Sequence, residues 1–170
     1  LYHKGAIMNN AVALDAGRVY FIESRNAAAM SNLDGRMRID RFCAGDTQLV
    51  ALDQDSGRKV WERPVQLPFQ HILYLSGADN VLVACGTYND GPGVYYGLFA
   101  FAMDTGKDLW QRSYRATNVR GTAYADLDGS HGEQWQHPVI IGGAVYSRPF
   151  AFDLYTGARK EYYLYRGGHG

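Results

Sequence analysis

The chain has 170 residues with 17 basic and 17 acidic side chains, so its formal net charge is zero. This balance gives no electrostatic reason to expect nucleic acid or an anionic membrane as a partner. No apolar run approaches the roughly 18 residues that a membrane-spanning helix needs. The length favours a single domain with a sizeable core, and the start at Leu1 without a visible signal peptide leaves a cleaved amino terminus open.

Pairs of short strands are expected at three places along the chain, each joined by a tight turn. The pairs cover residues 11–15 with 18–23, 71–76 with 81–85, and 138–141 with 144–148. The turns between them contain Gly, Asn or Asp, which are the residue types that hairpin turns prefer. The one helix signal is a short alanine patch at 27–30.

A second hairpin motif follows each pair and repeats along the chain. The segment QLVALDQDSGRKVW (48–61) returns as GLFAFAMDTGKDLW (97–110), with the repeated glycines 49 residues apart (106 − 57). A looser copy, PFAFDLYTGARKEYYLY (149–165), follows after 51 residues (157 − 106) and has Glu161 where tryptophan would fall. Periods of roughly 40 to 50 residues indicate stacked supersecondary units.

The centre of each motif predicts a bulged hairpin turn. Gly57, Gly106 and Gly157 are expected at the positive-φ position, and Asp55 and Asp104 are expected to bond the backbone ahead of them. The Ser or Thr before each glycine is therefore part of a turn and not a nucleophile. Fourth strands are expected over 59–65, 108–114 and 159–165.

The two best copies, ALDQDSGRKVW and AFAMDTGKDLW, resemble the repeat of the pyrroloquinoline quinone (PQQ)-type β-propellers, approximately A-x-D-x-x-T-G-x-x-x-W. The resemblance implies an all-β fold: three four-stranded antiparallel blades, approximately 5–66, 67–115 and 116–170, of a larger, eight-bladed ring. It also implies that Trp61, Trp110 and the Ala-x-Asp positions hold neighbouring blades together. Because such propellers are usually exported, it implies a periplasmic or extracellular location.

Long connections between strands are where function is expected, because loops this long inside a compact domain are usually functional or mobile. Segments 25–47 and 87–96 join second to third strands, and 115–134 joins two blades. Such connections all leave one side of a blade stack, whereas the short turns leave the other. We therefore expect one recognition surface carrying Arg36, Arg38, Arg41, Tyr88, Tyr95, Tyr96, Tyr124, Asp126, Asp128 and His131. Deletion of 87–96 is expected to abolish partner or ligand binding and to leave the fold intact. The alternative is that these loops seal against a neighbouring domain.

Each of these features has a second interpretation. The arginines suit an anion or carboxylate clamp, or they are neutralised within their own loop by Asp34, Asp40 and Asp46. The tyrosines stack a sugar or a peptide, or they pack between blades. Asp126, Asp128 and Glu133 follow part of a calcium-loop pattern, or they belong to a turn-rich surface loop.

Cysteine and histidine spacing excludes several kinds of site. Cys43 and Cys85 are too far apart for a C-x-x-C metal or redox site, and both a disulfide and two free thiols stay open. The histidines never show the H-E-x-x-H or i, i+4 spacing of a zinc site. No metal ligand set is therefore predicted beyond the calcium pattern.

No serine elbow, Walker loop or assignable carboxylate pair is present. By resemblance, a PQQ dehydrogenase would also show adjacent cysteines, a tryptophan floor and Glu, Asn and Asp ligands to calcium, and none can be placed here. The sequence favours a non-catalytic binding or scaffold module without a cofactor, part of a larger exported protein. Its expected partners are further blades or subunits and a protein, glycan or small ligand. The alternative is a fragment of a PQQ- and calcium-dependent quinoprotein dehydrogenase.

Overall fold

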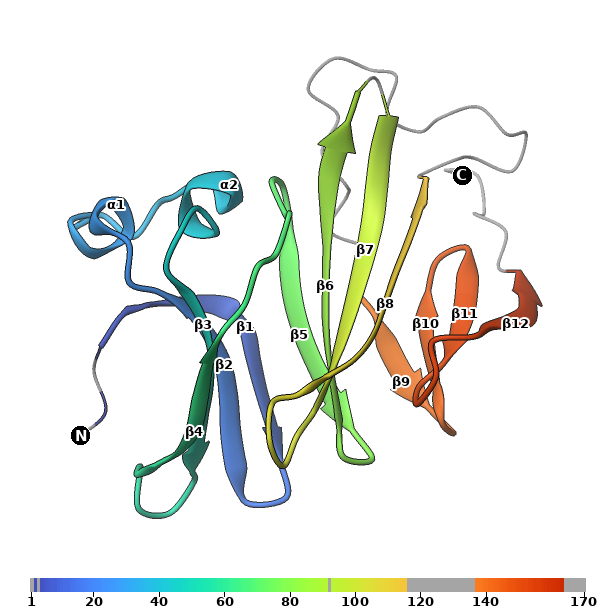
Figure 1. Ribbon diagram of the computed structural model, residues 1–170, viewed down its shortest axis with the longest axis horizontal. Coiled ribbons are helices and arrows are strands. Elements are labelled where there is room, and N and C mark those ends of the chain that lie inside the picture. The colour runs from blue at the N-terminus through green and yellow to red at the C-terminus, as the bar shows by residue number, and fades with distance from the viewer. Residues whose placement is uncertain (1, 3, 92, 116–136, 164–170) are drawn as a thin grey trace, which may run out of the picture.

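The computed structural model describes residues 2, 4–91, 93–115 and 137–163, which form three four-stranded antiparallel sheets and two short helices (Figure 1). The first sheet contains β1 (Ala6–Asp15), β2 (Arg18–Ser24), β3 (Thr47–Asp53) and β4 (Lys59–Pro64). The second contains β5 (Leu73–Ala78), β6 (Val81–Asp90), β7 (Gly93–Ala102) and β8 (Asp108–Arg115). The third contains β9 (Val139–Ile141), β10 (Ala144–Ser147), β11 (Phe150–Asp153) and β12 (Arg159–Tyr163). The helices are α1 (Ala27–Met30) and α2 (Ile39–Phe42).

Consecutive strands pair within every sheet, so each sheet is an antiparallel meander. The three sheets stand side by side in chain order, as blades of a propeller do (Figure 1). The predicted all-β fold with three four-stranded blades is confirmed. The helix at 27–30 was also predicted, whereas α2 was not. Among the described residues, no helix is long and apolar enough to cross a membrane.

Two apolar layers hold the blades together. Tyr20, Leu49 and Ala51 of the first blade share one core with side chains of the second blade that include Leu82 and Phe101. A separate core joins the second blade to the third. Since successive side chains of a strand point to opposite faces, a middle blade that is covered on both faces needs continuous apolar strands, and residues 81–85 (VLVAC) are all buried.

The repeated motif forms the same turn three times. Gly57, Gly106 and Gly157 have φ values of 65°, 72° and 66°, where only glycine is free of strain. Each β3–β4, β7–β8 and β11–β12 ladder also shows the predicted irregularity beside the turn. The side chain that bonds the turn was wrongly assigned to Asp55: Asp53 accepts the backbone N–H of Ser56 at 2.8 Å.

The third blade repeats this bond, because Asp153 accepts the backbone N–H of Thr156 at 2.9 Å. In the second blade Ala102 takes the equivalent place, and Asp104 accepts the hydroxyl of its neighbour Thr105. Asp53 and Asp153 each lie two residues before the expected position in the motif, and each bonds within its own turn. The Ala-x-Asp aspartate therefore stabilises a turn rather than a blade contact.

Tryptophan and arginine make the contacts between blades. The Nε1–H of Trp61 donates to the carbonyl oxygen of Met103 at 3.0 Å, and its ring covers Gly106, where an added Cβ would lie 2.8 Å from the indole. Nη1 of Arg63 donates to the carbonyl oxygen of Gly106 at 2.7 Å. The fourth strand of the first blade is thus fastened to the turn of the second.

The second blade is fastened to the third in the same way. The Nε1–H of Trp110 donates to the carbonyl oxygen of Leu154 at 2.8 Å, and Nε of Arg112 donates to that of Gly157 at 2.8 Å. The role of tryptophan at the blade contacts follows from these bonds, and the arginine two residues later is its partner. We call this pair the Trp-x-Arg plug and the turn that receives it the socket.

An ionic cluster lies on the face of the first blade that points away from the second. Glu23 is fully buried, and its Oε1 accepts from Nε of Arg25 at 2.7 Å and from the hydroxyl of Tyr2 at 2.8 Å. Glu62 accepts from Arg25 at 2.7 Å and also from Lys4 and Lys59. Hydrogen bonds from these cations hold the pKa of Glu62 well below its usual value. Tyr2 and Lys4 are thereby fixed against the blade.

Candidate recognition surface

The α1–α2 segment, residues 25–46, is held in place by one asparagine. Oδ1 of Asn26 caps α1 by accepting the backbone N–H of Ala29 at 2.8 Å. Nδ2 of Asn26 donates to the carbonyl oxygens of Arg41 (2.9 Å), Phe42 (3.2 Å) and Ala44 (2.8 Å). Ala29 and Phe42 are buried, so the segment is anchored on the inside as well. These contacts give a segment with two four-residue helices a fixed shape.

The outer side of this segment carries apolar and cationic side chains. Leu33 is 99% exposed and Met30 is 46% exposed, and Arg36, Arg38 and Arg41 are also exposed. Arg38 forms an ion pair with Asp40 at 2.8 Å, and its hydrogen bond lowers the pKa of that carboxyl group. Neutralisation within the loop, the alternative given above, therefore applies to Arg38.

Residues 87–96 are not the turn-rich loop that was expected. β6 and β7 continue as one hairpin, in which Tyr88 pairs with Tyr95 and Asp90 with Gly93. Turn-forming residues occupy only its tip. Val94 and Tyr96 are buried against Ile72, so removal of the whole segment would take away packed side chains. We therefore now expect deletion of the whole segment to disturb the fold as well as binding.

The tyrosines of this hairpin differ in how far they are packed against the rest of the chain. Tyr88 and Tyr95 stack with ring centroids 5.8 Å apart, and both are half-buried. Tyr96 is 5% exposed and stacks on Tyr114 at 5.3 Å. The structure thus gives Tyr96 a packing role, which was the second interpretation. Tyr88 also packs against the core shared by the first two blades, and Tyr95 is left at the surface.

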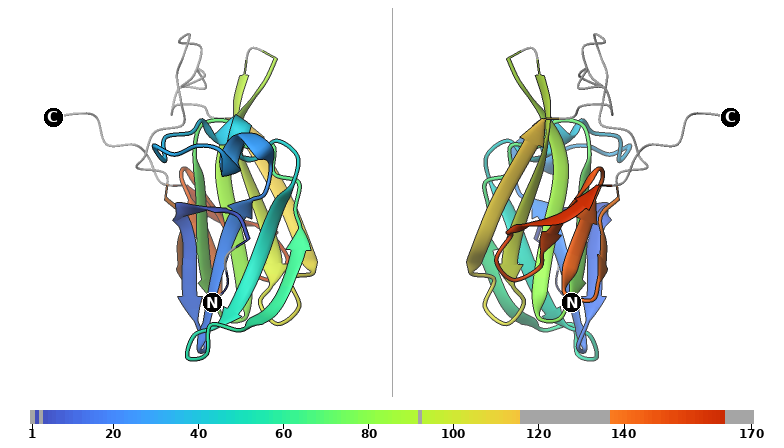
Figure 2. Two further views of the ribbon diagram at one scale, coloured as in Figure 1. Left: turned by 90° about the vertical axis from the view of Figure 1, so that its left-hand side faces the viewer. Right: turned by 90° about the vertical axis from the view of Figure 1, so that its right-hand side faces the viewer.

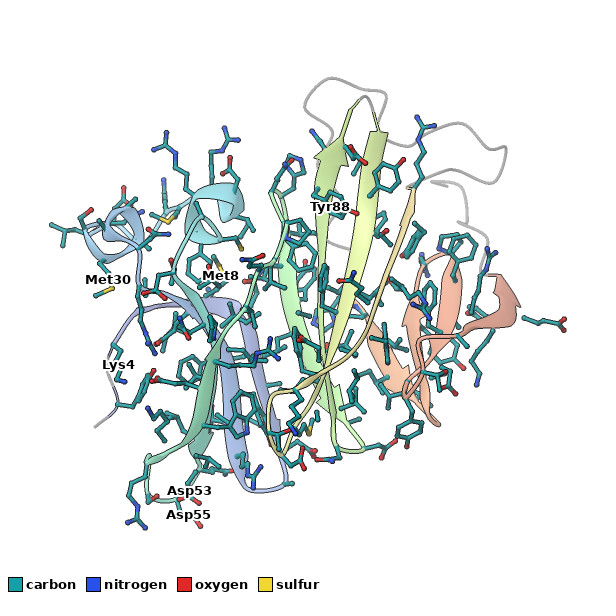
Figure 3. The ribbon with its side chains drawn as sticks, viewed as in Figure 1. Lys4, Met8, Met30, Asp53, Asp55 and Tyr88 are labelled. Atoms are coloured by element: carbon teal, nitrogen blue, oxygen red, sulfur yellow. The ribbon has the colours of Figure 1, made fainter. Side chains whose placement is uncertain are left out.

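Both elaborated segments lie at the same end of the blades. In Figures 1 and 2 the α1–α2 segment and the tip of the β6–β7 hairpin project from one end, and the β1–β2, β3–β4, β5–β6 and β7–β8 turns lie at the other. Figure 3 places Met30 and Tyr88 at the first end and Asp53 and Asp55 at the second. We call the end that carries the α1–α2 segment and the hairpin tip the loop end. Tyr124, Asp126, Asp128, His131 and Glu133 lie outside the described residues.

The described residues offer no metal-binding cluster, and their two cysteines are free thiols. Within the described ranges, no group of three or more His, Cys, Asp or Glu side chains could hold a metal ion. Cys43 and Cys85 are free thiols, and burial raises the pKa of each to about 12. Such thiols stay protonated at neutral pH and are poor nucleophiles.

Sequence reasoning missed two residues that shape the loop end. Asn26 was one polar residue in a segment noted for its arginines, and only the fold shows the four hydrogen bonds of its side chain. Gln70 lies beside β6, where its Oε1 accepts the backbone N–H of Asn89 at 3.0 Å. Gln70 thereby covers the part of the β6 edge that extends beyond the start of β5. The available signal for Asn26 was its position directly before the alanine patch, because asparagine, like serine and threonine, is a preferred N-cap residue.

The family of the chain follows from a comparison with protein-family models. The crystal structure of BamB from Moraxella catarrhalis is similar to this chain with a TM-score of 0.48 and 16% sequence identity, over 87% of this chain and 34% of that one. The chain thus spans about a third of the length of that relative. A comparison with curated proteins finds no match. A family model described as "Outer membrane protein assembly factor BamB" matches residues 6–160. With its repeated blades and this match, the chain belongs to that family of PQQ-like repeat propellers.

Proposed function

We propose that this chain is a non-catalytic binding module of a larger exported protein, and that a protein partner binds at its loop end. The observation that carries the proposal is the unequal development of the two ends. One end has only short turns, whereas the other has a clamped 22-residue insertion, 25–46, and a hairpin that extends past its neighbouring strands. Unequal elaboration of a rigid scaffold is typical of a recognition surface.

The chemistry of the loop end suits a protein more than a small ligand. Leu33 and Met30 expose apolar area on a projecting segment, and arginine and tyrosine are enriched in protein interfaces. Arg36 and Arg41 are exposed beside them, so a matching partner would offer an apolar pocket bordered by carboxylates. The family description, an outer membrane protein assembly factor, supports a role in protein assembly and a periplasmic location.

The same proposal expects no cofactor in this segment. PQQ and calcium belong to the dehydrogenase hypothesis, whose calcium candidates Asp126, Asp128 and Glu133 lie outside the described residues. Isothermal titration of the purified chain with calcium, and with PQQ in the presence of calcium, should give no saturable heat. Stoichiometric binding of either would favour the dehydrogenase hypothesis instead.

Site-specific photo-crosslinking tests where the partner binds. A photoreactive amino acid is placed at Leu33 or Tyr95 on the loop end, and at Arg58 or Lys107 in the turns of the opposite end, in the protein expressed in its own cells. Adducts with a protein should form from the first two positions and not from the second two. Adducts confined to Arg58 and Lys107, or a lack of adducts from all four positions, would contradict the proposal.

A further inference from the structure

The α1–α2 segment leaves the first blade through a stem that Arg25 closes. The backbone N–H of Arg25 donates to the carbonyl oxygen of Asp46 at 2.7 Å, directly after Ser24 and Thr47 pair at the end of the β2–β3 ladder. The side chain of Arg25 lies in the ionic cluster on the face of the first blade that points away from the second. Arg25 therefore belongs to the recognition segment by its backbone and to the blade by its side chain.

The guanidinium group of Arg25 joins three separate parts of the chain. Its Nε donates to Oε1 of Glu23 on β2 at 2.7 Å. Its Nη2 donates to Oε2 of Glu62 on β4 at 2.7 Å and to the hydroxyl of Tyr2, before β1, at 2.8 Å. The planar fork of arginine reaches several acceptors in fixed directions, which the point charge of a lysine does not.

The burial of Glu23 strongly favours this position of the arginine. Glu23 is fully buried, and among the described residues its second oxygen, Oε2, has no hydrogen-bond partner. A buried carboxylate is costly unless a cation is paired with it, and Arg25 is the cation that forms the ion pair with Glu23, at 2.6 Å. Displacement of the Arg25 side chain would leave the charge of Glu23 buried and unpaired.

A second anchor holds the α1–α2 segment on the opposite side. Phe42 is 3% exposed and belongs to the core that the first blade shares with the second, whereas the cluster around Arg25 lies on the far face of the first blade. A segment held at one point can turn about that point. Anchors on opposite sides fix its orientation, so both Phe42 and Arg25 are needed for a fixed recognition surface.

Residues before β1 complete the anchor at Arg25. A Cβ added at Gly5 would lie 3.2 Å from Cγ of Arg25, so this part of the chain packs directly on the stem. The ring of Tyr2 packs edge-on against Phe21, with centroids 5.8 Å apart. Figure 3 shows Lys4 on the same side of the first blade as Met30 of the α1–α2 segment.

From these contacts we infer that Arg25 is a positioning residue for the loop end, and that Tyr2 controls the orientation of the α1–α2 segment through it. A shift of Tyr2 away from the blade would loosen the stem at Arg25 and let the segment turn about Phe42. Leu33 would then lose its fixed position at the loop end. The consequence for partner binding rests on the function proposed above, whereas the coupling itself is a property of this chain alone.

Amide hydrogen exchange of the purified chain measures the coupling without a partner. Arg25→Lys keeps a cation beside Glu23 but loses the fork that also reaches Glu62 and Tyr2. Amides of residues 27–44 should exchange about tenfold faster, as expected for the loss of a hydrogen bond between charged groups. Amides of residues 49–51, in the buried strand β3, should keep their native rate. Tyr2→Phe, 23 residues away from Arg25, should accelerate the same amides of the segment.

Arg38→Lys is the matched control. The ion pair of Arg38 with Asp40 lies within the segment, and the Arg38 side chain is 73% exposed, so exchange over residues 27–44 should stay at the native rate. If Arg25→Lys does not fold by circular dichroism, Tyr2→Phe is compared with Arg38→Lys instead. Unchanged exchange in the segment, or equal acceleration over residues 49–51, would overturn the inference.

Photo-crosslinking separates this inference from the proposed function. With the photoreactive amino acid at Leu33, Arg25→Lys should give several-fold less protein adduct than Arg38→Lys in the cells of origin. Equal adduct yields from the two variants would overturn the positioning role of Arg25. A lack of adducts from the native chain would contradict the proposed function, and the exchange rates alone would then decide the coupling.

Discussion

The indole of Trp110 lies directly over Gly157 of the next blade, and its Nε1–H donates to the Leu154 carbonyl oxygen at 2.8 Å. The glycine thus has two functions, since it takes a positive φ in its own turn and leaves room for a neighbouring ring. Trp61 and Gly106 repeat the relationship. Contacts of this kind fix each blade relative to the next. The α1–α2 segment and the hairpin tip therefore keep a fixed position relative to each other.

Tyr114 should be the most sensitive tyrosine for the contact between the second and third blades. Its hydroxyl contacts Oγ of Ser147 at 2.7 Å and donates toward the carbonyl oxygen of Arg148 at 2.9 Å, and burial raises its pKa well above the usual value. Tyr114→Phe should lower the free energy of unfolding by about 1 to 2 kcal/mol, because buried partners lose their hydrogen bond. Tyr155→Phe, at an exposed tyrosine, should change it little. Urea denaturation measures both, and equal effects would contradict the assignment.

Asn26 should control the shape of the α1–α2 segment. Asn26→Asp keeps the acceptor that caps α1 but replaces a donor to three carbonyl oxygens with a carboxylate. Amide hydrogen exchange over residues 25–46 should accelerate about tenfold or more, as loss of roughly 1.4 kcal/mol of local stability implies. Asn32→Asp, which removes one exposed bond to Arg36, is the control. Unchanged exchange in Asn26→Asp would show that the clamp is not needed.

The blade architecture could be predicted because its motif repeats along the chain, whereas features that occur only once, such as α2, were missed. Trp61 and Trp110 stand at equal distances from their glycines, so each copy supports the other. The choice between Asp53 and Asp55 depends on backbone geometry, because both carboxylates are close enough in sequence to bond the turn. The α2 helix has only four residues, too few for a periodic pattern.

The β6–β7 hairpin was missed for a different reason. Asn89, Asp90, Gly91 and Gly93 are strong turn residues, and they made the whole of 87–96 resemble a loop. Their effect is confined to the tip, since the flanking Thr87 and Val94 are buried. Pairing across the hairpin, which depends on partners on the opposite strand, outweighs local preference there.

Glu62 should make the first blade sensitive to acid. Hydrogen bonds from Lys59 and Arg25 hold its pKa below the ordinary value of 4.5, so the folded state binds its proton less readily than the unfolded state. The stabilisation is complete above pH 4.5 and is lost as the pH falls toward the folded pKa. Glu62→Gln should cost about 1 kcal/mol at pH 7, and the difference from the native chain should shrink below pH 4.5. Thermal unfolding across pH checks this, with Asp108→Asn, at an exposed ion pair, as control; a gap that does not narrow in acid would contradict it.

The free energies of unfolding of Gly157→Ala and Gly57→Ala, measured in parallel, test the docked-blade account most directly. Both substitutions place a methyl group at a φ of about 65°, so both should lose about 1 to 2 kcal/mol from backbone strain. Only at Gly157 does the methyl group meet an indole, at 2.6 Å, which should add about 1 to 3 kcal/mol. The account predicts that added loss for Gly157→Ala and its disappearance when Trp110 is also replaced by alanine. Equal losses at the two glycines would contradict it.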